Sequence, residues 1–257
     1  MPAEEIAGGL EKRREGRFTE MLREMKLHRD GFSAEHLKWI RDDPEICKLS
    51  VGRDNLTLLL FAANYDCAKM LEELLATGAC DARAIDRDGY SALMFAAMAE
   101  NEVVSERMVR ALIPHCSMKG RAAEETRNGI QDIHFAMRDG NLKVAKLLAE
   151  ARGCGDLSIG GPLSTDSCGK NWLRLALASR SQGEALAWVL SLPSARLMLN
   201  SGDDKGRTPW GLASELANHW PEALEQLRAA RAMWERDDLL RDASICGSVG
   251  RKGLGRL

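Results

Sequence analysis

Apolar residues along this chain recur at the spacing of amphipathic α-helices rather than in the strict alternation of strands. The clearest stripes are Phe18, Met21, Leu22 and Met25 near the N-terminus, Met70, Leu71, Leu74 and Leu75 further on, and then Val109, Leu112 and Ile113. Aromatic residues make up only 5% of the chain, whereas β-sandwiches rely on aromatic and β-branched side chains. The pattern therefore predicts an all-α fold.

Five short apolar segments each follow a residue that tolerates a sharp reversal of the chain. The segments begin at Asn55, Gly89, Gly129, Gly169 and Gly206, at successive separations of 34, 40, 40 and 37 residues. Glycine, and less readily asparagine, adopts the positive φ that such turns need, so we expect Gly89 and Gly129 to have positive φ. This period is typical of a solenoid, in which each unit has a face that it cannot bury alone.

After each turn the sequence predicts a short apolar helix and then a longer amphipathic one. Thr208 and Pro209 are typical of a helix start, because the hydroxyl can cap free N–H groups and proline fits the first turn. We expect the short helices at residues 57–63, 91–98, 131–138, 171–178 and 208–216, each with an antiparallel second helix after it.

The five segments resemble the ankyrin-repeat family, whose pattern runs D-x-x-G-x-T-P-L-H-x-A-A. The last segment keeps this pattern best, with Asp203, Gly206, Thr208 and Pro209, although Thr-Pro occurs only there. The resemblance covers about residues 48–230 and implies an all-α solenoid of helix-turn-helix repeats. It also implies a structural role for His134, which falls on the family's histidine and would tie adjacent turns by hydrogen bonds.

The two ends of the chain are predicted to be caps. We expect residues 1–47 to form an N-terminal helical cap or degenerate first repeat, with a second helix from Ser33 to Arg41. Residues 48–230 then form an ankyrin-like array of about five repeats, and residues 231–257 a C-terminal cap helix and a flexible basic tail. The cap helix or helices should span Pro221–Leu240, and the glycine-rich tail should begin at Ser244.

Charge and cysteine content limit the classes of partner and compartment. Lys and Arg number 36 and Asp and Glu 38, so we expect no nucleic acid and no membrane partner. The apolar run around residues 56–63 is far shorter than the roughly 20 residues that cross a bilayer. Seven cysteines without a C-x-x-C pair, and an acidic start without a secretory pattern, favour reduced thiols in a cytoplasmic or nuclear protein.

Motifs for chemistry are weak throughout the sequence. Gly169-Lys170 fails as a phosphate loop, since Ser164 stands in place of the first glycine and Asn171 in place of the Ser or Thr. The five histidines offer no close pair for zinc, and no catalytic motif surrounds any cysteine or histidine. We therefore expect no metal, no cofactor and no enzymatic reaction, with a Cys/His-dependent enzyme as the third alternative.

The remaining candidate is a surface, because ankyrin-like stacks contact partners through turn tips and the exposed side of each first helix. The predicted partner-binding residues are Arg53, Leu56, Tyr65, Arg87, Tyr90, Met98, Arg127, Ile130, Arg138, Lys170, Lys205 and Arg207. An extended acidic segment with spaced apolar side chains would suit these cationic and apolar positions. Asp54 and Asp88 could, however, neutralise the arginines, and the turn tips could also be exposed to solvent without binding a partner.

These observations predict a monomeric protein–protein interaction module, acting as a scaffold or adaptor. An inhibitor or regulatory subunit of an enzyme would use the same surface, so the sequence does not separate these two roles.

Overall fold

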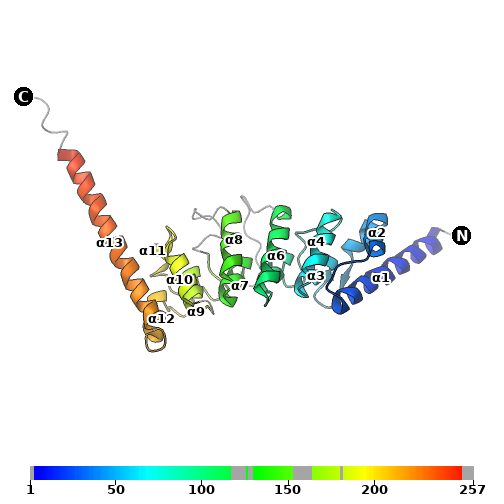
Figure 1. The fold of residues 1–257 in the computed structure, drawn as a ribbon, viewed down its shortest axis with the longest axis horizontal. Helices are drawn as coiled ribbons and strands as arrows, with labels where there is room; N and C mark the ends of the chain where they lie inside the picture. The colour runs from blue at the N-terminus through cyan, green and yellow to red at the C-terminus, as the bar shows by residue number, and fades with distance from the viewer. Residues whose placement is uncertain (1–2, 117–125, 127–129, 153–163, 180–181, 251–257) are drawn as a thin grey trace, which may run out of the picture.

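The structure is a computed structural model that describes residues 3–116, 126, 130–152, 164–179 and 182–250. Its helices stack side by side into one elongated array, with the two ends of the chain at opposite ends (Figure 1). The all-α ankyrin-type helix-turn-helix solenoid predicted from the sequence is therefore confirmed.

Five short first helices stand where the sequence predicts them. They are α3 (Leu58–Asn64), α5 (Ala92–Met98), α7 (Asp132–Asp139), α9 (Trp172–Ala178) and α12 (Pro209–Leu216). The second helices that follow are α4 (Ala68–Ala76), α6 (Glu102–Leu112), α8 (Leu142–Arg152), α10 (Gln182–Leu190) and α13 (Pro221–Gly250). Each turn with its two helices is called a unit below and is named by its first helix.

Equivalent polar residues cap four of the five first helices. The side chains of Thr57, Ser91, Asn171 and Thr208 each accept a hydrogen bond from the backbone N–H three residues later, at 3.0–3.4 Å. These bonds satisfy N–H groups that have no partner inside the helix. The recurrence of the cap shows that these four units begin their first helices in the same way.

The turns before the first helices need positive φ, as predicted. Gly89 has φ 88°, Gly169 and Gly206 each have φ 72°, and Asn55 has φ 58°. The same prediction for Gly129 lies outside the described residues. Two short antiparallel strands, β1 (Ser50–Val51) and β2 (Leu56–Thr57), flank the first turn and were not predicted. They form because the reversal brings two extended backbones side by side.

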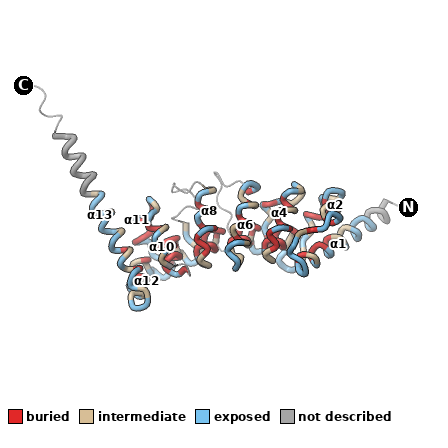
Figure 2. Tube along the Cα trace, viewed as in Figure 1, coloured by how far each residue is buried: buried red, intermediate tan, exposed pale blue. Residues whose placement is uncertain are grey.

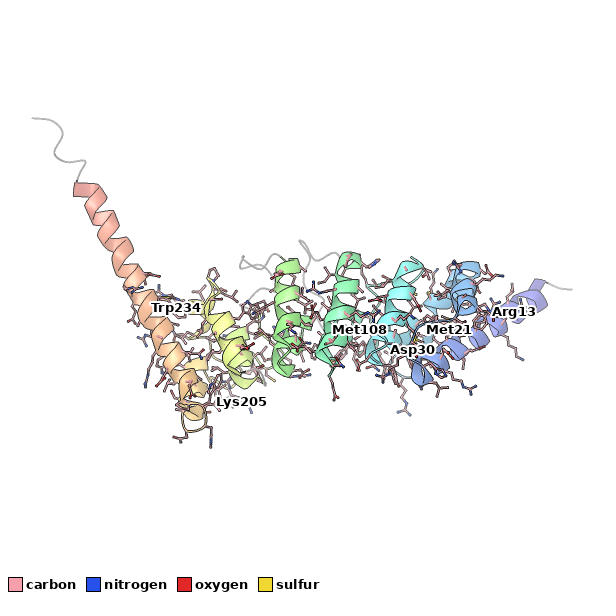
Figure 3. The ribbon with its side chains drawn as sticks, viewed as in Figure 1. Arg13, Met21, Asp30, Met108, Lys205 and Trp234 are labelled. Atoms are coloured by element: carbon pink, nitrogen blue, oxygen red, sulfur yellow. The ribbon has the colours of Figure 1, made fainter. Side chains whose placement is uncertain are left out.

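One continuous core runs through all units (Figure 2). Met21 in the N-terminal cap and Met108 in α6 are both fully buried, although they lie in different parts of the stack (Figure 3). The small residues before the end of α3 and α5, including Ala63 and Ala97, are also fully buried and allow close helix contact.

The N-terminal cap consists of α1 (Ala3–Leu27), α2 (Ala34–Asp42) and the 3₁₀ helix η1 (Pro44–Lys48). Phe18, Met21, Leu22 and Met25, the stripe predicted from the sequence, are buried on α1. Ser33 caps α2 by accepting from the His36 N–H at 3.2 Å. The cap therefore closes the first face of the array with apolar side chains.

The chain after α6 differs from the sequence-based expectation in two respects. A short helix η2 (Ile113–His115) and a further helix α11 (Ala195–Met198) were not predicted. The expected tail from Ser244 is wrong as far as Gly250, since α13 continues without a break to that residue. Isolated glycines cost a helix only about 1 kcal/mol each, so they do not end it by themselves. The division of the chain at residue 230, which falls inside α13, remains a prediction.

Candidate partner-binding surface

An aspartate at the start of three turns holds each turn in the same shape. One carboxylate oxygen of Asp86, Asp166 and Asp203 accepts hydrogen bonds from the N–H groups two and four residues later, at 2.7–3.0 Å. The backbone N–H of each aspartate also donates to the carbonyl four residues later. Residues 87–88, 167–168 and 204–205 are therefore presented at equivalent positions on the turn tips before α5, α9 and α12.

Backbone hydrogen bonds join neighbouring turns at both ends of the array. The Arg87 N–H donates to the Asp54 carbonyl at 2.7 Å, and the Asp204 N–H donates to the Cys168 carbonyl at 3.1 Å. The tips are thus connected through the main chain as well as through side chains.

The arginines at the first two turns are available to a partner. Arg53 and Arg87 are exposed, and within the described residues neither side chain makes a hydrogen bond or an ion pair. Asp54 and Asp88, which could have neutralised them, form no ion pair with them in this part of the structure. Each guanidinium therefore keeps its donors for an external carboxylate.

Three cations of the later units are already paired. Arg138 makes two hydrogen bonds to Asp139 at 2.9 and 3.0 Å, Lys170 lies 3.9 Å from Asp166, and Arg207 lies 2.9 Å from Asp203. These carboxylates come from the units' own turns and helices, so the three cations differ from Arg53 and Arg87 in having a partner within the chain.

Two further predicted cations complete the set. Lys205 is exposed at the turn before α12 and has no ion pair within the described residues (Figure 3). Arg127 lies outside the described residues.

The predicted apolar positions form a partly covered line. Leu56, Tyr90 and Ile130 occupy the same slot in three units, and all three are half-buried against the core. The Tyr90 ring stacks on Phe95 with centroids 5.5 Å apart and contacts Phe135 at 5.6 Å. Tyr90 therefore supports the fold as well as offering one edge to solvent.

Three phenylalanines of this line escaped the sequence analysis. Phe61, Phe95 and Phe135 precede the Ala-Ala or Ala-Met pair of their units, so their equivalent placement was visible in the alignment of the segments. Tyr65 stacks on Phe61 at 4.2 Å, and the Lys26 ammonium of α1 lies 5.5 Å from the Phe61 ring centroid. Phe61 and Phe135 are buried, so the row lies beneath the surface, with Lys26 over Phe61 and Arg138 over Phe135.

His134 connects two units through its two ring nitrogens, as the resemblance implied. Nδ1 accepts from the Gln131 N–H at 3.2 Å, and Nε2 lies 3.1 Å from the Ser164 hydroxyl of the following turn. Burial lowers the pKa of His134 from 6.5 to about 4, against a smaller opposing influence of Asp166 and Asp132. The ring is therefore neutral at physiological pH, which suits a structural link.

A buried ion pair anchors the last turn. Arg174 of α9 is buried and places its guanidinium 3.0 Å from Asp203, which also receives Arg207. Burial by itself would raise the pKa of Asp203, but hydrogen bonds from Arg207 and Lys205 and the charge of Arg174 lower it to about 2. This carboxylate therefore remains ionised at any ordinary pH.

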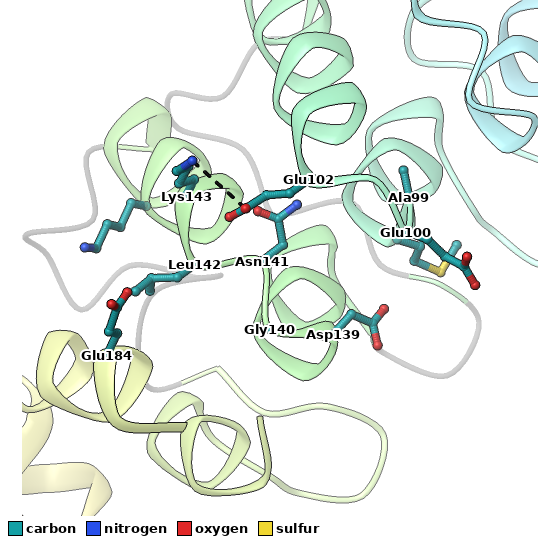
Figure 4. A pocket seen from close by; sticks show the side chains of 11 residues that line it. Ala99, Glu100, Glu102, Asp139, Gly140, Asn141, Leu142, Lys143 and Glu184 are labelled. Atoms are coloured by element: carbon teal, nitrogen blue, oxygen red, sulfur yellow. Dashed lines mark ion pairs between the residues drawn. The ribbon is translucent and has the colours of Figure 1, made fainter. Parts of the chain in front are cut away.

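A pocket of about 960 Å³ opens on the other edge of the array, at the loops that join α5 to α6 and α7 to α8 (Figure 4). Its charged lining residues are Glu100, Glu102, Asp139, Lys143, Lys146 and Glu184. Met98, one of the predicted contact residues, also lines it and is half-buried. The excess of carboxylates makes this pocket unsuitable for the acidic segment expected at the turn tips.

Two other kinds of site were searched for in the described residues. No group of three or more His, Cys, Asp or Glu side chains is arranged there to hold a metal ion. No helix in the described ranges combines the length and apolar character that a membrane span requires.

Comparison with known proteins shows what part of the array resembles. Residues 58–160 match the family model described as ankyrin repeats, in three copies. This segment is therefore similar to ankyrin repeats. A crystal structure of the ankyrin repeat protein EF0377 is similar, with a TM-score of 0.62 and 16% identity over 81% of this chain and 96% of that one. At that identity the likeness concerns the fold alone. No curated protein sequence matches the chain.

The ankyrin-repeat register explains why His134 and Arg174 both point to the next turn. Each lies five residues after its turn glycine, at the position of the family's histidine. His134 reaches Ser164, and Arg174 reaches Asp203, so both side chains tie a first helix to the following unit. The same position holds Leu60 and Met94 in the α3 and α5 units, where both are fully buried.

Proposed function

We propose that this chain is a scaffold or adaptor that binds an extended acidic segment of another protein across the turns before α3 and α5. Ankyrin repeats are generally protein–protein interaction modules, and this array has the fold that such binding uses. The acidic and apolar character of the partner follows from the side chains that this surface presents.

The availability of Arg53 and Arg87 is the observation that carries the proposal. These two guanidinium groups are exposed at successive turns that a backbone hydrogen bond holds together. Half-buried Leu56 and Tyr90 lie three residues further along each turn and offer apolar edges. Two carboxylates at matching spacing would pair with the two arginines, and an apolar side chain beside each carboxylate would contact Leu56 and Tyr90.

Charge reversal tests the proposal without removing core contacts. The full chain, the double variant Arg53→Glu with Arg87→Glu and the control variant Lys69→Glu with Lys146→Glu are immobilised and exposed to the same cell extract. The control lysines are exposed on the second helices α4 and α8, so both variants change the net charge equally. Bound proteins are identified and quantified by mass spectrometry.

We expect a partner that binds the full chain and the control alike and binds the Arg53/Arg87 variant at least about tenfold less. Its binding should also weaken at high salt, because exposed charges are screened. A partner held equally by all three proteins would place the binding site elsewhere. An active enzyme among the retained partners, inhibited by the chain, would instead indicate a regulatory subunit.

A further inference from the structure

Two cysteines from neighbouring parts of the array are in direct contact. The Sγ atoms of Cys47, in η1, and Cys80, after α4, lie 2.6 Å apart, and both residues are free thiols in this structure. Neither takes part in the surface proposed above. Their contact joins the N-terminal cap to the α3 unit.

The contact arises from the repeat itself. Cys47 and Cys80 are 33 residues apart, close to one repeat length, and each precedes the turn of the next unit. Cys116 follows after another 36 residues, and its Sγ lies 3.9 Å from the Ala82 carbonyl. Stacking therefore brings residues at the same register position together, and at the first junction both are cysteine.

The surroundings favour reaction at this pair over the other buried thiols. Cys80 is half-buried and its sulfur contacts buried Cys47, whereas Cys67 is fully buried. The Cys80 thiol donates to Cys47, which lowers the pKa of Cys47, while the same bond and burial raise the pKa of Cys80. Burial raises the pKa of Cys67 and leaves that thiol unreactive.

We propose that Cys47 and Cys80 are a modification site, at which a hydroperoxide oxidises the two thiols to one intramolecular disulfide. The Cys47 thiolate attacks one peroxide oxygen and the O–O bond breaks. The other oxygen leaves as hydroxide or, from an organic hydroperoxide, as alkoxide, and is protonated to water or an alcohol. Cys80 then loses its proton and attacks the sulfenic sulfur of Cys47. The S–S bond forms, the S–O bond breaks, and water leaves.

Overall, the two thiols lose two electrons and two protons, and the peroxide takes up both. The disulfide covalently fixes the N-terminal cap to the α3 unit, at the end of the array that carries Arg53. Reduction by a dithiol restores the free pair.

The test uses the full chain and hydrogen peroxide. After graded oxidation, free thiols are alkylated, the protein is digested without reduction, and the peptides are identified by mass spectrometry. We expect the Cys47 and Cys80 peptides to be recovered joined and to separate on treatment with dithiothreitol. The midpoint of thermal unfolding should rise by about 5–10 °C on oxidation, because the cross-link restricts the unfolded chain.

Exposed Cys168 provides the matched control. Cys168→Ser should keep the cross-link and the rise in midpoint, while Cys80→Ser and Cys47→Ser should each lose both. Because the peptide map of the unmutated chain needs no variant, a folding defect in Cys47→Ser leaves the test intact. If Cys47 and Cys80 both remain open to alkylation after unfolding, at a peroxide dose that fully oxidises Cys168, the proposal is wrong.

Discussion

The turns before α5 and α12 have the same backbone but use their charges differently. In both, an aspartate accepts two N–H groups and a glycine with positive φ completes the reversal. Asp203 also neutralises Arg174 and Arg207, whereas Asp86 forms no ion pair within the described residues. Arg87 consequently stays free while Arg207 is held.

The difference originates in the first helix of the preceding unit. Arg174 is buried in α9, and a buried guanidinium requires a carboxylate, which the next turn supplies. Leu60 occupies the matching position of α3, and because it is uncharged it needs no carboxylate from Asp86. One motif therefore yields an aspartate that is paired with two arginines before α12 and an aspartate without an ion pair in the described residues before α5.

Removing the two aspartates should give the largest contrast. Asp203→Ala leaves Arg174 buried without its counter-charge, so we expect the midpoint of thermal unfolding to fall by about 10 °C. Asp86→Ala loses only the hydrogen bonds from two N–H groups, so its unfolding midpoint should fall by about half as much. Equal losses, measured by circular dichroism, would show that the buried ion pair adds nothing to the last turn.

A pH series tests the polar link between the α7 and α9 units. The unfolded chain protonates His134 near pH 6.5, but the folded chain does so only near pH 4, so stability is complete above pH 6.5 and falls as the pH decreases. The difference between these pKa values corresponds to about 3 kcal/mol of unfolding free energy.

The measurement is urea unfolding between pH 7 and pH 4, compared with His134→Asn. The variant keeps an acceptor near Nδ1 but cannot titrate, so it should lose less stability over this range than the unmutated chain. Parallel curves for the two proteins would mean that burial of the imidazole does not depress its pKa in solution.

Gly89 tests the backbone that both turns share. Its φ of 88° is strained for a residue with a branched Cβ, so Gly89→Val should reduce the unfolding free energy by roughly 1–3 kcal/mol. Denaturant unfolding gives the value, with Ala84→Val, outside the turn glycines, as the control. A loss no greater than that of the control contradicts the prediction.

The smallest effect should distinguish the free arginine from the paired one. Arg207→Ala breaks the exposed part of the Asp203 network and should cost about 0.5–1 kcal/mol of unfolding free energy. Arg87→Ala removes no contact of the described structure and should change stability by less than about 0.3 kcal/mol. Similar costs for the two variants would show that Arg87 has a structural role after all.

The sequence predicted the units because their signals are local. Positive φ at Gly89, the cap at Thr208 and the apolar stripe on α4 each depend on residues a few positions apart. The continuation of α13 to Gly250 was missed because the cost of a glycine is small compared with an established helix.

Which surface cations are paired within the chain could not be predicted in the same way. Whether a turn cation is free depends on a carboxylate whose other partner comes from the preceding unit, as with Asp203 and Arg174. Contact between Cys47 and Cys80 likewise depends on how closely two units stack, although their 33-residue separation was visible. Such features follow from tertiary packing rather than from the spacing of one motif.

The main-chain bonds between turns also have a mechanical consequence. A tensile force on the ends of the array must stretch the bonds from Arg87 to Asp54 and from Asp204 to Cys168 before those turns can separate. Amide hydrogen bonds are short-ranged and directional, so they resist extension until they break. At these two junctions the turn edge of the array therefore resists extension.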